Sequence, residues 1–495
     1  MAINSVSTSS NSIVQSLLDM RAQFDDLQRQ LSTGQKSASY AGLGSGRGLS
    51  VSLNSQMSTM TAFDNSIDMI DTRLKLAQTS LDGMSTIGNQ MKALVVQGGA
   101  NSGNASSAQL TAQSSLQQLL GLLNAQAGGR YLFSGRATDQ PAVETYDHIV
   151  NGDGARAGLK QLIDERAQAD LGASGLGRLT VGGTASSVTL DEDAGPFGFK
   201  LASASSNLSN ATVSGPTGSP ANLTVNFTGQ PNDGDTLTVR FNLPDGTTTN
   251  LTMTATTKSP PGDNQFTIGG STAATVSNLQ GALSTALGAL AGSTLKAASA
   301  VTASNDFFSA DLSNPPQRVA GPPFDTATAM TAGTTANTVV WYTGEAGPDP
   351  ARGTATTRID PALVVSYGAR ANETGLRTLV QNVATLAAVT ISPTDPNLTN
   401  LTAALSQRVG TGLAGSPGQQ SVTDIEAELA GVQTTMASVK GRHAQVSATL
   451  GDMLQQISGV SNEDVGAQIL TLQTRMQASM QTTAMMYQLS LVKFI

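Results

Sequence analysis

Apolar residues recur at every third or fourth position in the first part of the chain. The steps alternate between four and three residues, which predicts an amphipathic, coiled-coil-like helix. We expect this helix to end at Thr33 and Gly34, because glycine commonly follows the last helical turn. Beyond a glycine-rich segment at 42–48, a second stripe predicts a long helix between Leu53 and Leu94. The residues of the first stripe are Ile13, Leu17, Met20, Phe24, Leu27 and Leu31.

The last part of the chain carries two similar stripes. One keeps an unbroken alternation of four- and three-residue steps in which only His443 is not apolar, and it predicts a long helical rod. The apolar residues of this predicted rod seam are Ile425, Leu429, Val432, Met436, Val439, Val446, Leu450, Met453, Ile457 and Val460. The other stripe predicts a final helix. We expect this final stripe and the first stripe of the chain to form an assembly surface together. The residues of the final stripe are Ile469, Leu472, Met476, Met480, Tyr487 and Leu491.

Between the helical ends, from about residue 175 to about 345, the pattern changes to short alternating runs. Alternation before and after Pro244-Asp245-Gly246 predicts a β-hairpin. A further run at Leu223–Phe227 predicts a strand, and the spacing from Leu279 to Leu290 predicts one short helix. A helical stripe returns from Leu376 to Leu386.

This pattern predicts a fold that is mainly α at both termini, with long paired coiled-coil-like helices, and a β-rich outer domain inserted between them. Stripes at opposite ends of a chain can bury each other, so we expect the termini to pair and the middle to project. The expected division is terminal assembly helices at 1–45 and 461–495, a helical rod domain at 46–174 and 346–460, and the β-rich domain at 175–345.

The composition points to a polar but weakly charged surface. Charged residues make up 13% of the chain, against about 25% in ordinary globular domains. Neighbouring copies with such a surface can pack closely without strong repulsion or desolvation. The net charge of −8 and the lack of a lysine and arginine cluster in the sequence argue against nucleic acid as a partner.

The sequence contains no cysteine, so it can form neither a disulfide nor a thiolate metal site. The N-terminal segment has no basic residue before Arg21 and no continuous apolar core, so we expect no secretory signal peptide. No stretch approaches about 18 apolar residues, so we expect no membrane insertion. These features alone predict a cytoplasmic protein, unless a dedicated machine exports the chain without a cleaved signal.

Side chains suited to catalysis are scarce. We expect His148 on the surface or at a strand edge, and His443 as a tolerated polar residue of the rod seam. Ser293 and Lys296 match the S-x-x-K pattern but lack its Lys-Thr-Gly and Ser-Asp-Asn partners. We therefore expect no enzyme, no catalytic residue, no cofactor and no metal. A secreted adhesin that holds a ligand on a helical stalk is the alternative to an assembling structural protein.

Both ends of the chain resemble the bacterial flagellin family. The N-terminal resemblance lies in Leu31–Lys36 and in the helix from Ile67 to Gln97, and the C-terminal one closes with Tyr487–Leu491. It covers about the first 140 and the last 75 residues. Within the family, Gly128–Gly135 is similar to the hook-associated proteins, whereas filament flagellins more often have a Phe-Asn-Gly type sequence there.

The resemblance implies paired terminal helices that form an inner tube, a helical rod outside it, and β domains that face solvent. It also implies a non-enzymatic subunit for motility that assembles with itself as a ring or helix at the hook-filament junction, with a filament-forming flagellin as the alternative. The implied partners are other hook-associated proteins, filament flagellin, the flagellar type III export apparatus and an export chaperone. The implied location is the extracellular flagellum, reached by export without a cleaved signal peptide.

Overall fold

The computed structural model describes residues 3–98 and 105–492 of the 495-residue chain. The chain divides into two compact units, each built from segments that are distant in sequence. The first unit contains 1–71, 357–364 and 434–495, and the second contains 72–356 and 365–433. The three-part division expected from the sequence stays a prediction.

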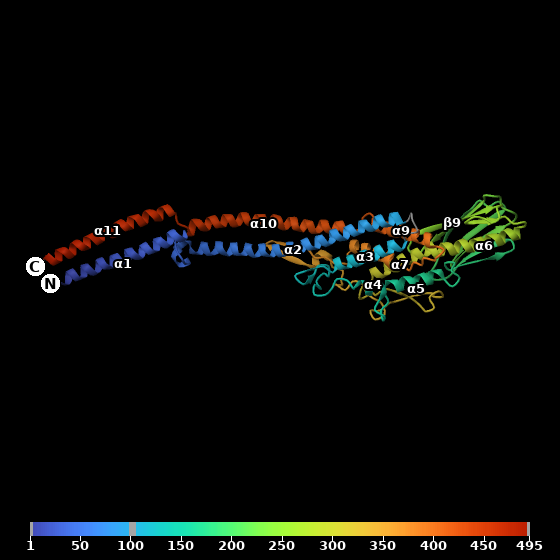
Figure 1. The fold of residues 1–495 in the computed structure, drawn as a ribbon, viewed down its shortest axis with the longest axis horizontal. Helices are drawn as coiled ribbons and strands as arrows, with labels where there is room; N and C mark the ends of the chain where they lie inside the picture. Colours follow the sequence, from blue (N-terminus) through green and yellow to red (C-terminus); the bar gives the residue numbers. More distant parts are fainter. Residues whose placement is uncertain (1–2, 99–104, 493–495) are drawn as a thin grey trace. The chain divides into compact units, whose positions relative to one another are not determined.

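The first unit is built from the two ends of the chain. Helix α1 (Ile3–Thr33) and helix α11 (Asn462–Val492) lie side by side, with the start of α1 and the end of α11 at the same end of the pair (Figure 1). A 3-10 helix (Tyr40–Gly46) follows α1. The unit also takes the first part of α2 (Arg47–Gly98) and the last part of α10 (Val422–Ser458).

A short backbone junction joins the two ends of the chain. The Lys36 N–H donates to the Ser458 carbonyl at 2.7 Å, and the Val460 N–H donates to the Gly34 carbonyl at 3.1 Å. Gly34 has a φ of +67°, a left-handed conformation that ends α1 at little steric cost in a residue without Cβ. The expected end of the first helix is therefore confirmed.

The second unit combines a helical part with a β-rich part. In the helical part, Trp341 is fully buried and its indole N–H donates to the Phe308 carbonyl at 3.0 Å, so the largest side chain leaves no unpaired donor. Besides the remaining parts of α2 and α10, its helices are α3 (Ala105–Leu123), α4 (Tyr146–Asn151), α5 (Leu159–Leu171), α7 (Lys296–Ser309), α8 (Thr374–Ala388) and α9 (Leu398–Ala414).

The β-rich part holds two four-stranded sheets. Their strand orders are β3-β4-β7-β6 and β10-β9-β8-β5, and every pair is antiparallel except β10 with β9. The strands are β3 (Leu179–Thr184), β4 (Ser187–Glu192), β5 (Lys200–Ser206), β6 (Ala211–Gly218), β7 (Ala221–Phe227), β8 (Thr236–Asn242), β9 (Thr248–Thr256) and β10 (Gln265–Thr267).

Alternation along the strands buries one face of each sheet. In the predicted hairpin, Leu237 pairs with Met253 and Val239 pairs with Leu251, and all four side chains are buried. Helix α6 (Thr272–Leu290) contributes its own apolar side chains to the same core. Figure 1 shows α6 alongside the strands.

Short two-stranded pieces complete the described chain. They are β1 (Gln126–Ala127) with β2 (Arg130–Tyr131), β11 (Arg318–Val319) with β12 (Met330–Thr331), and β13 (Thr356–Asp360) with β14 (Leu363–Ser366). A 3-10 turn (Ala351–Thr354) precedes β13.

The structure confirms the predicted hairpin, the strand at Leu223–Phe227 and the helix through Leu376. It corrects the length of the predicted short helix. Helix α6 continues through a π-helical turn (Ala291–Leu295) into α7, so the helical segment extends from Thr272 to Ser309. The alanine and serine residues of α7 from Ala297 to Ser304 are buried, and a leucine-based pattern misses a helix packed through such small side chains.

We expect Leu283→Ala to lower the free energy of unfolding by about 2 to 5 kcal/mol, because Leu283 is buried in the core shared by α6 and the sheets. Chemical denaturation followed by circular dichroism measures the change. The exposed Thr285, two residues on, is the matched position: Thr285→Ala should change stability by less than about 0.5 kcal/mol. Equal effects of the two substitutions would contradict this packing.

Candidate assembly surfaces

The stripe predicted on the first helix faces the partner helix in part. Ile13, Leu17, Met20, Phe24 and Leu27 are all half-buried in the single chain. The sixth residue of the stripe, Leu31, is 42% exposed. The spacing of this stripe therefore identifies the side of α1 turned toward protein for five of its six positions.

The stripe predicted on the last helix is buried less evenly. Leu472 is buried, Ile469 and Met476 are half-buried, and Met480 is exposed. The side chains of Tyr487 and Leu491 lie outside the described residues. The assembly role of both stripes stays a prediction.

Leu31 and Leu472 do not lie in one layer of the helix pair. Gln35 pairs with Gly459, and α1 and α11 run antiparallel from that point. Because both helices rise 1.5 Å per residue, Leu472 is roughly level with position 22 of α1, near Met20 and Phe24.

A second set of apolar residues on these helices is exposed, and the predicted stripes did not include most of it. Leu18 is 61% exposed and Leu470 is 65% exposed. The sequence signal was present, since Leu18 and Leu470 directly follow stripe residues and widen the apolar stripe of each helix. Among the described side chains, this set contains Val14, Leu18 and Leu31 on α1, and Leu470, Met480, Met485 and Met486 on α11.

The rod seam predicted on α10 also needs a correction. Val446 and Met453 are more than a third exposed, whereas Ser447 and Leu454, one position further on, are half-buried. The residues on the inward side of α10 are therefore spaced four apart twice in succession, from Val439 to His443 and from His443 to Ser447. Of the other seam residues, Ile425, Leu429, Met436, Val439 and Leu450 are buried, and Val432, Ile457 and Val460 are half-buried.

His443 is held by specific polar partners in the first unit. Its side chain is almost fully buried, with Nδ1 at 2.8 Å from Asp64 Oδ1 and Nε2 at 3.4 Å from Asp360 Oδ2. The Phe63 ring lies 6.2 Å from the imidazole, centroid to centroid. His443 thus links α2, α10 and the end of β13, a role that its place in the stripe did not reveal.

The charged groups around His443 favour an ionised Asp360. The Ala362 N–H and the Arg442 guanidinium both donate to this carboxylate, and together they hold its pKa below the ordinary value of 3.8. The His443 ring adds a smaller contribution in the same direction. One helical turn away, Lys440 pairs with Asp68, so oppositely charged groups are matched along this stretch of α2 and α10.

The other residues considered for chemistry have structural partners. His148 lies in α4, not at a strand edge, and its Nδ1 is 3.0 Å from Glu144 Oε2. Ser293 is buried in the π-helical turn, where its hydroxyl donates to the Ala289 carbonyl at 2.6 Å. Lys296 lies 3.8 Å from Asp395. Ser293 therefore has neither a base beside it nor open access.

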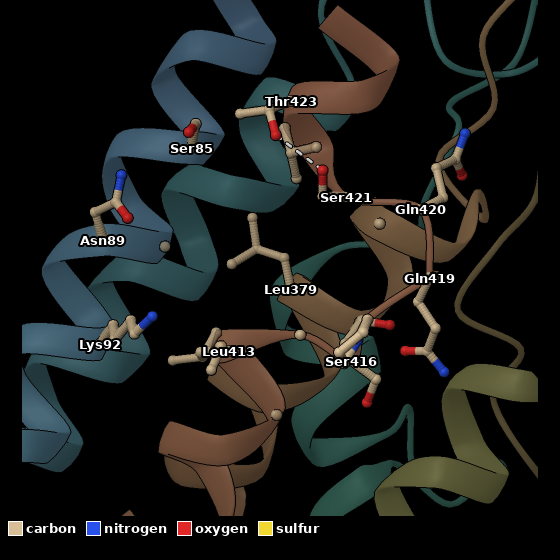
Figure 2. A pocket seen from close by; sticks show the side chains of 18 residues that line it. Ser85, Asn89, Lys92, Leu379, Leu413, Ser416, Gln419, Gln420, Ser421 and Thr423 are labelled. Atoms are coloured by element: carbon tan, nitrogen blue, oxygen red, sulfur yellow. Dashed lines mark hydrogen bonds between the residues drawn. The ribbon is translucent and has the colours of Figure 1, made fainter.

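A cleft of about 520 Å³ lies in the second unit, between α2, α8, α9 and the start of α10 (Figure 2). Its walls carry mostly polar, uncharged side chains such as Asn89 and Gln419, and Ser421 and Thr423 hydrogen-bond to each other at 2.8 Å. Lys92 is the one ionisable side chain among the described residues that line it. The cleft therefore provides no acid and base pair.

The described residues contain neither a metal-binding cluster nor a membrane-spanning helix. Within 3–98 and 105–492, no three histidine or acidic side chains gather in a way that could hold a metal ion. In the same part of the chain, no helix is both long enough and apolar enough to cross a membrane.

The stretch Gly128–Gly135 forms a tight turn followed by buried residues. Gly128 and Gly129 have φ values of +60° and +74° and join β1 to β2, beyond the end of α3 at Leu123. Phe133 and Ser134 are fully buried, and the Ala371 N–H donates to the Phe133 carbonyl at 2.8 Å. The part of the stretch from Leu132 to Gly135 thus belongs to the core of the second unit.

Long helices at both ends of the chain and a region of two β-sheets between them form the architecture expected of a flagellin-like structural protein. Residues 3–138 match the bacterial flagellin N-terminal helical region. The match covers the N-terminal part of the chain alone, and it supports a relationship to the bacterial flagellins and a role as a flagellar structural subunit. No curated protein matches the chain. The resemblance of the last 75 residues stays a prediction.

We expect Asp360→Asn to lower the melting temperature at neutral pH. The pKa of Asp360 is depressed in the folded chain, so its stabilising effect is present above the ordinary value of 3.8 and is lost as the pH falls through the folded pKa. The difference from the unsubstituted chain should therefore shrink in acid. Melting curves across this pH range measure it, with Asp452→Asn on the exposed face of α10 as the control. A difference that does not depend on pH would contradict an ionised Asp360.

Proposed function

We propose that the chain is an exported subunit of the bacterial flagellum that assembles with itself through α1 and α11, at the junction between hook and filament. The observation that carries the assembly role is the pair of terminal helices with apolar side chains on two sides. One side faces the partner helix, and the other, which includes Leu18 and Leu470, is open to solvent in the single chain. Apolar surface of this kind commonly marks an interaction site.

The energetics favour a second copy as the cover for this surface. Burying an exposed leucine side chain contributes about 1.5 to 3 kcal/mol. In a symmetric assembly the same gain is repeated in every subunit. Beyond the first turn of α11, Arg475 is the one charged side chain among the described residues. Neighbouring copies of this helix therefore meet little like-charge repulsion.

The junction position rests on the sequence of Gly128–Gly135, which resembles hook-associated proteins more than filament flagellins. At this position the partners are other hook-associated proteins on one side and filament flagellin on the other. Delivery by the flagellar type III apparatus, with an export chaperone, accounts for an extracellular location without a cleaved signal peptide. The β-rich region faces solvent in this proposal.

Two alternatives predict different results. A filament-forming flagellin shares the terminal helices but is needed in many copies along the filament. An adhesin on a helical stalk needs a ligand site in the β-rich region and does not need α1 and α11 to assemble. The flagellin match over residues 3–138 favours the first alternative over the second.

Deleting the gene distinguishes the junction role from the filament role. We expect cells that have hooks but no filaments, and flagellin released into the medium, because the filament has no base on which to assemble. Electron microscopy of the cells and immunoblotting of the medium measure the two effects. Complete flagella in the deletion strain would contradict both flagellar roles. Bare hooks without released flagellin would favour the filament-forming alternative.

We expect Leu18→Ser combined with Leu470→Ser to abolish assembly without unfolding the single chain. Both side chains are mainly exposed, so their loss removes contacts between copies and few contacts within one. Sedimentation of the purified chain measures assembly, and circular dichroism checks the fold. Leu312→Ser is the control, because Leu312 is also more than half exposed but lies outside both terminal helices. Normal assembly of the double variant would exclude these two residues from the interface.

A further inference from the structure

Three arginines line one small cleft in the second unit. The cleft has a volume of about 240 Å³ and lies between α2, β2 with the segment that follows it, and the segment after β14. The arginines are Arg73 on α2, Arg130 on β2 and Arg136 just beyond Gly135. Among the described residues that line the cleft, none is acidic. This concentration of positive charge is unusual in a chain with 27 basic and 35 acidic residues.

Two of these arginines lack a compensating charge. Arg136 pairs with Glu345 at 2.6 Å and with Asp349 at 3.2 Å. Within the described part of the chain, neither Arg73 nor Arg130 has an acidic side chain at ion-pair distance. Like charges that share a cleft repel each other, and a bound anion removes that repulsion.

The guanidinium of Arg73 provides an independent indication of a ligand. Its Nε atom is buried, yet it has no hydrogen-bond partner among the described residues. Buried polar groups in proteins nearly always have a partner, so an orphaned donor at the wall of a cleft indicates that a missing group accepts from it. Leu74 and Ala77 also line the cleft, so the wall beside Arg73 is apolar.

We propose that this cleft binds an oxyanion, either a free phosphate-type ion or the carboxylate of an acidic side chain on another molecule. The planar guanidinium fork matches two oxygens of a carboxylate or phosphate group. Arg73 supplies the inner donor and Arg130, which is exposed, supplies the outer one. Thr138 and Tyr367 add hydroxyl-bearing side chains to the lining, and hydroxyls also donate to oxyanions.

The test uses the full chain with isotopically labelled arginine, and inorganic phosphate as the first probe. We expect the Nε–H resonance of Arg73 to shift saturably with phosphate at constant ionic strength, and not with chloride. A short peptide with one glutamate, compared with its glutamine counterpart, is the second probe. A response to phosphate shows that a free oxyanion is sufficient as the ligand. A response to the glutamate peptide alone identifies the ligand as a side-chain carboxylate. No saturable response to either probe would overturn the proposal and leave water as the partner of Arg73.

Variants locate the site. Calorimetry should show the dissociation constant rising at least about tenfold in Arg73→Gln and in Arg130→Gln, because each substitution removes a charge-assisted hydrogen bond. Arg240→Gln removes an exposed arginine from β8 and should change the dissociation constant less than about twofold. Arg130 is exposed, so its variant keeps the test valid if Arg73→Gln does not fold. Equal affinities in Arg130→Gln and Arg240→Gln would overturn the assignment.

Discussion

The backbone hydrogen bonds that join Gly34 and Lys36 to Val460 and Ser458 determine what the two ends of the chain can do. Because they connect segments more than 420 residues apart, α1 and α11 leave the same junction and run side by side. Each helix then covers one apolar side of the other and leaves a second apolar side uncovered. Without the junction, two separated amphipathic helices would each lack a partner, and isolated helices gain little stability in water.

Elements whose pattern is local were predictable from the sequence. The β8–β9 hairpin follows from period-two alternation on both sides of a Pro-Asp-Gly turn, and α8 follows from its leucine and valine spacing. The seam of α10 was predictable only in part. A straight α-helix has 3.6 residues per turn, so a strict seven-residue repeat drifts by about 20° per heptad relative to the helix. The step from His443 to Ser447 follows the helix, whereas the predicted step to Val446 follows the repeat.

Interactions between distant segments could not be read from the sequence. Asp64, Asp360 and His443 come from three parts of the chain, and no local spacing relates them. The same holds for Glu165 with Arg318 and for Asp245 with Arg408, two ion pairs whose acidic members are buried. Only 13% of the residues are charged. Burying a charge without a partner costs free energy, so most charges that the fold buries need a specific partner. Arg73 in the arginine cleft differs from these buried pairs, because its buried Nε atom has no hydrogen-bond partner among the described residues.

In the proposed assembly, the uncovered apolar sides of α1 and α11 would couple folding of the chain ends to the binding of a neighbouring copy. A helix pair that buries one side only is less stable than one covered on both, so a neighbouring copy stabilises the pair by binding its folded form. That stabilisation grows with the concentration of subunits, whereas the second unit has its own core around Trp341 and the two sheets. In the proposed assembly, the ends of the chain would therefore draw part of their stability from neighbouring copies.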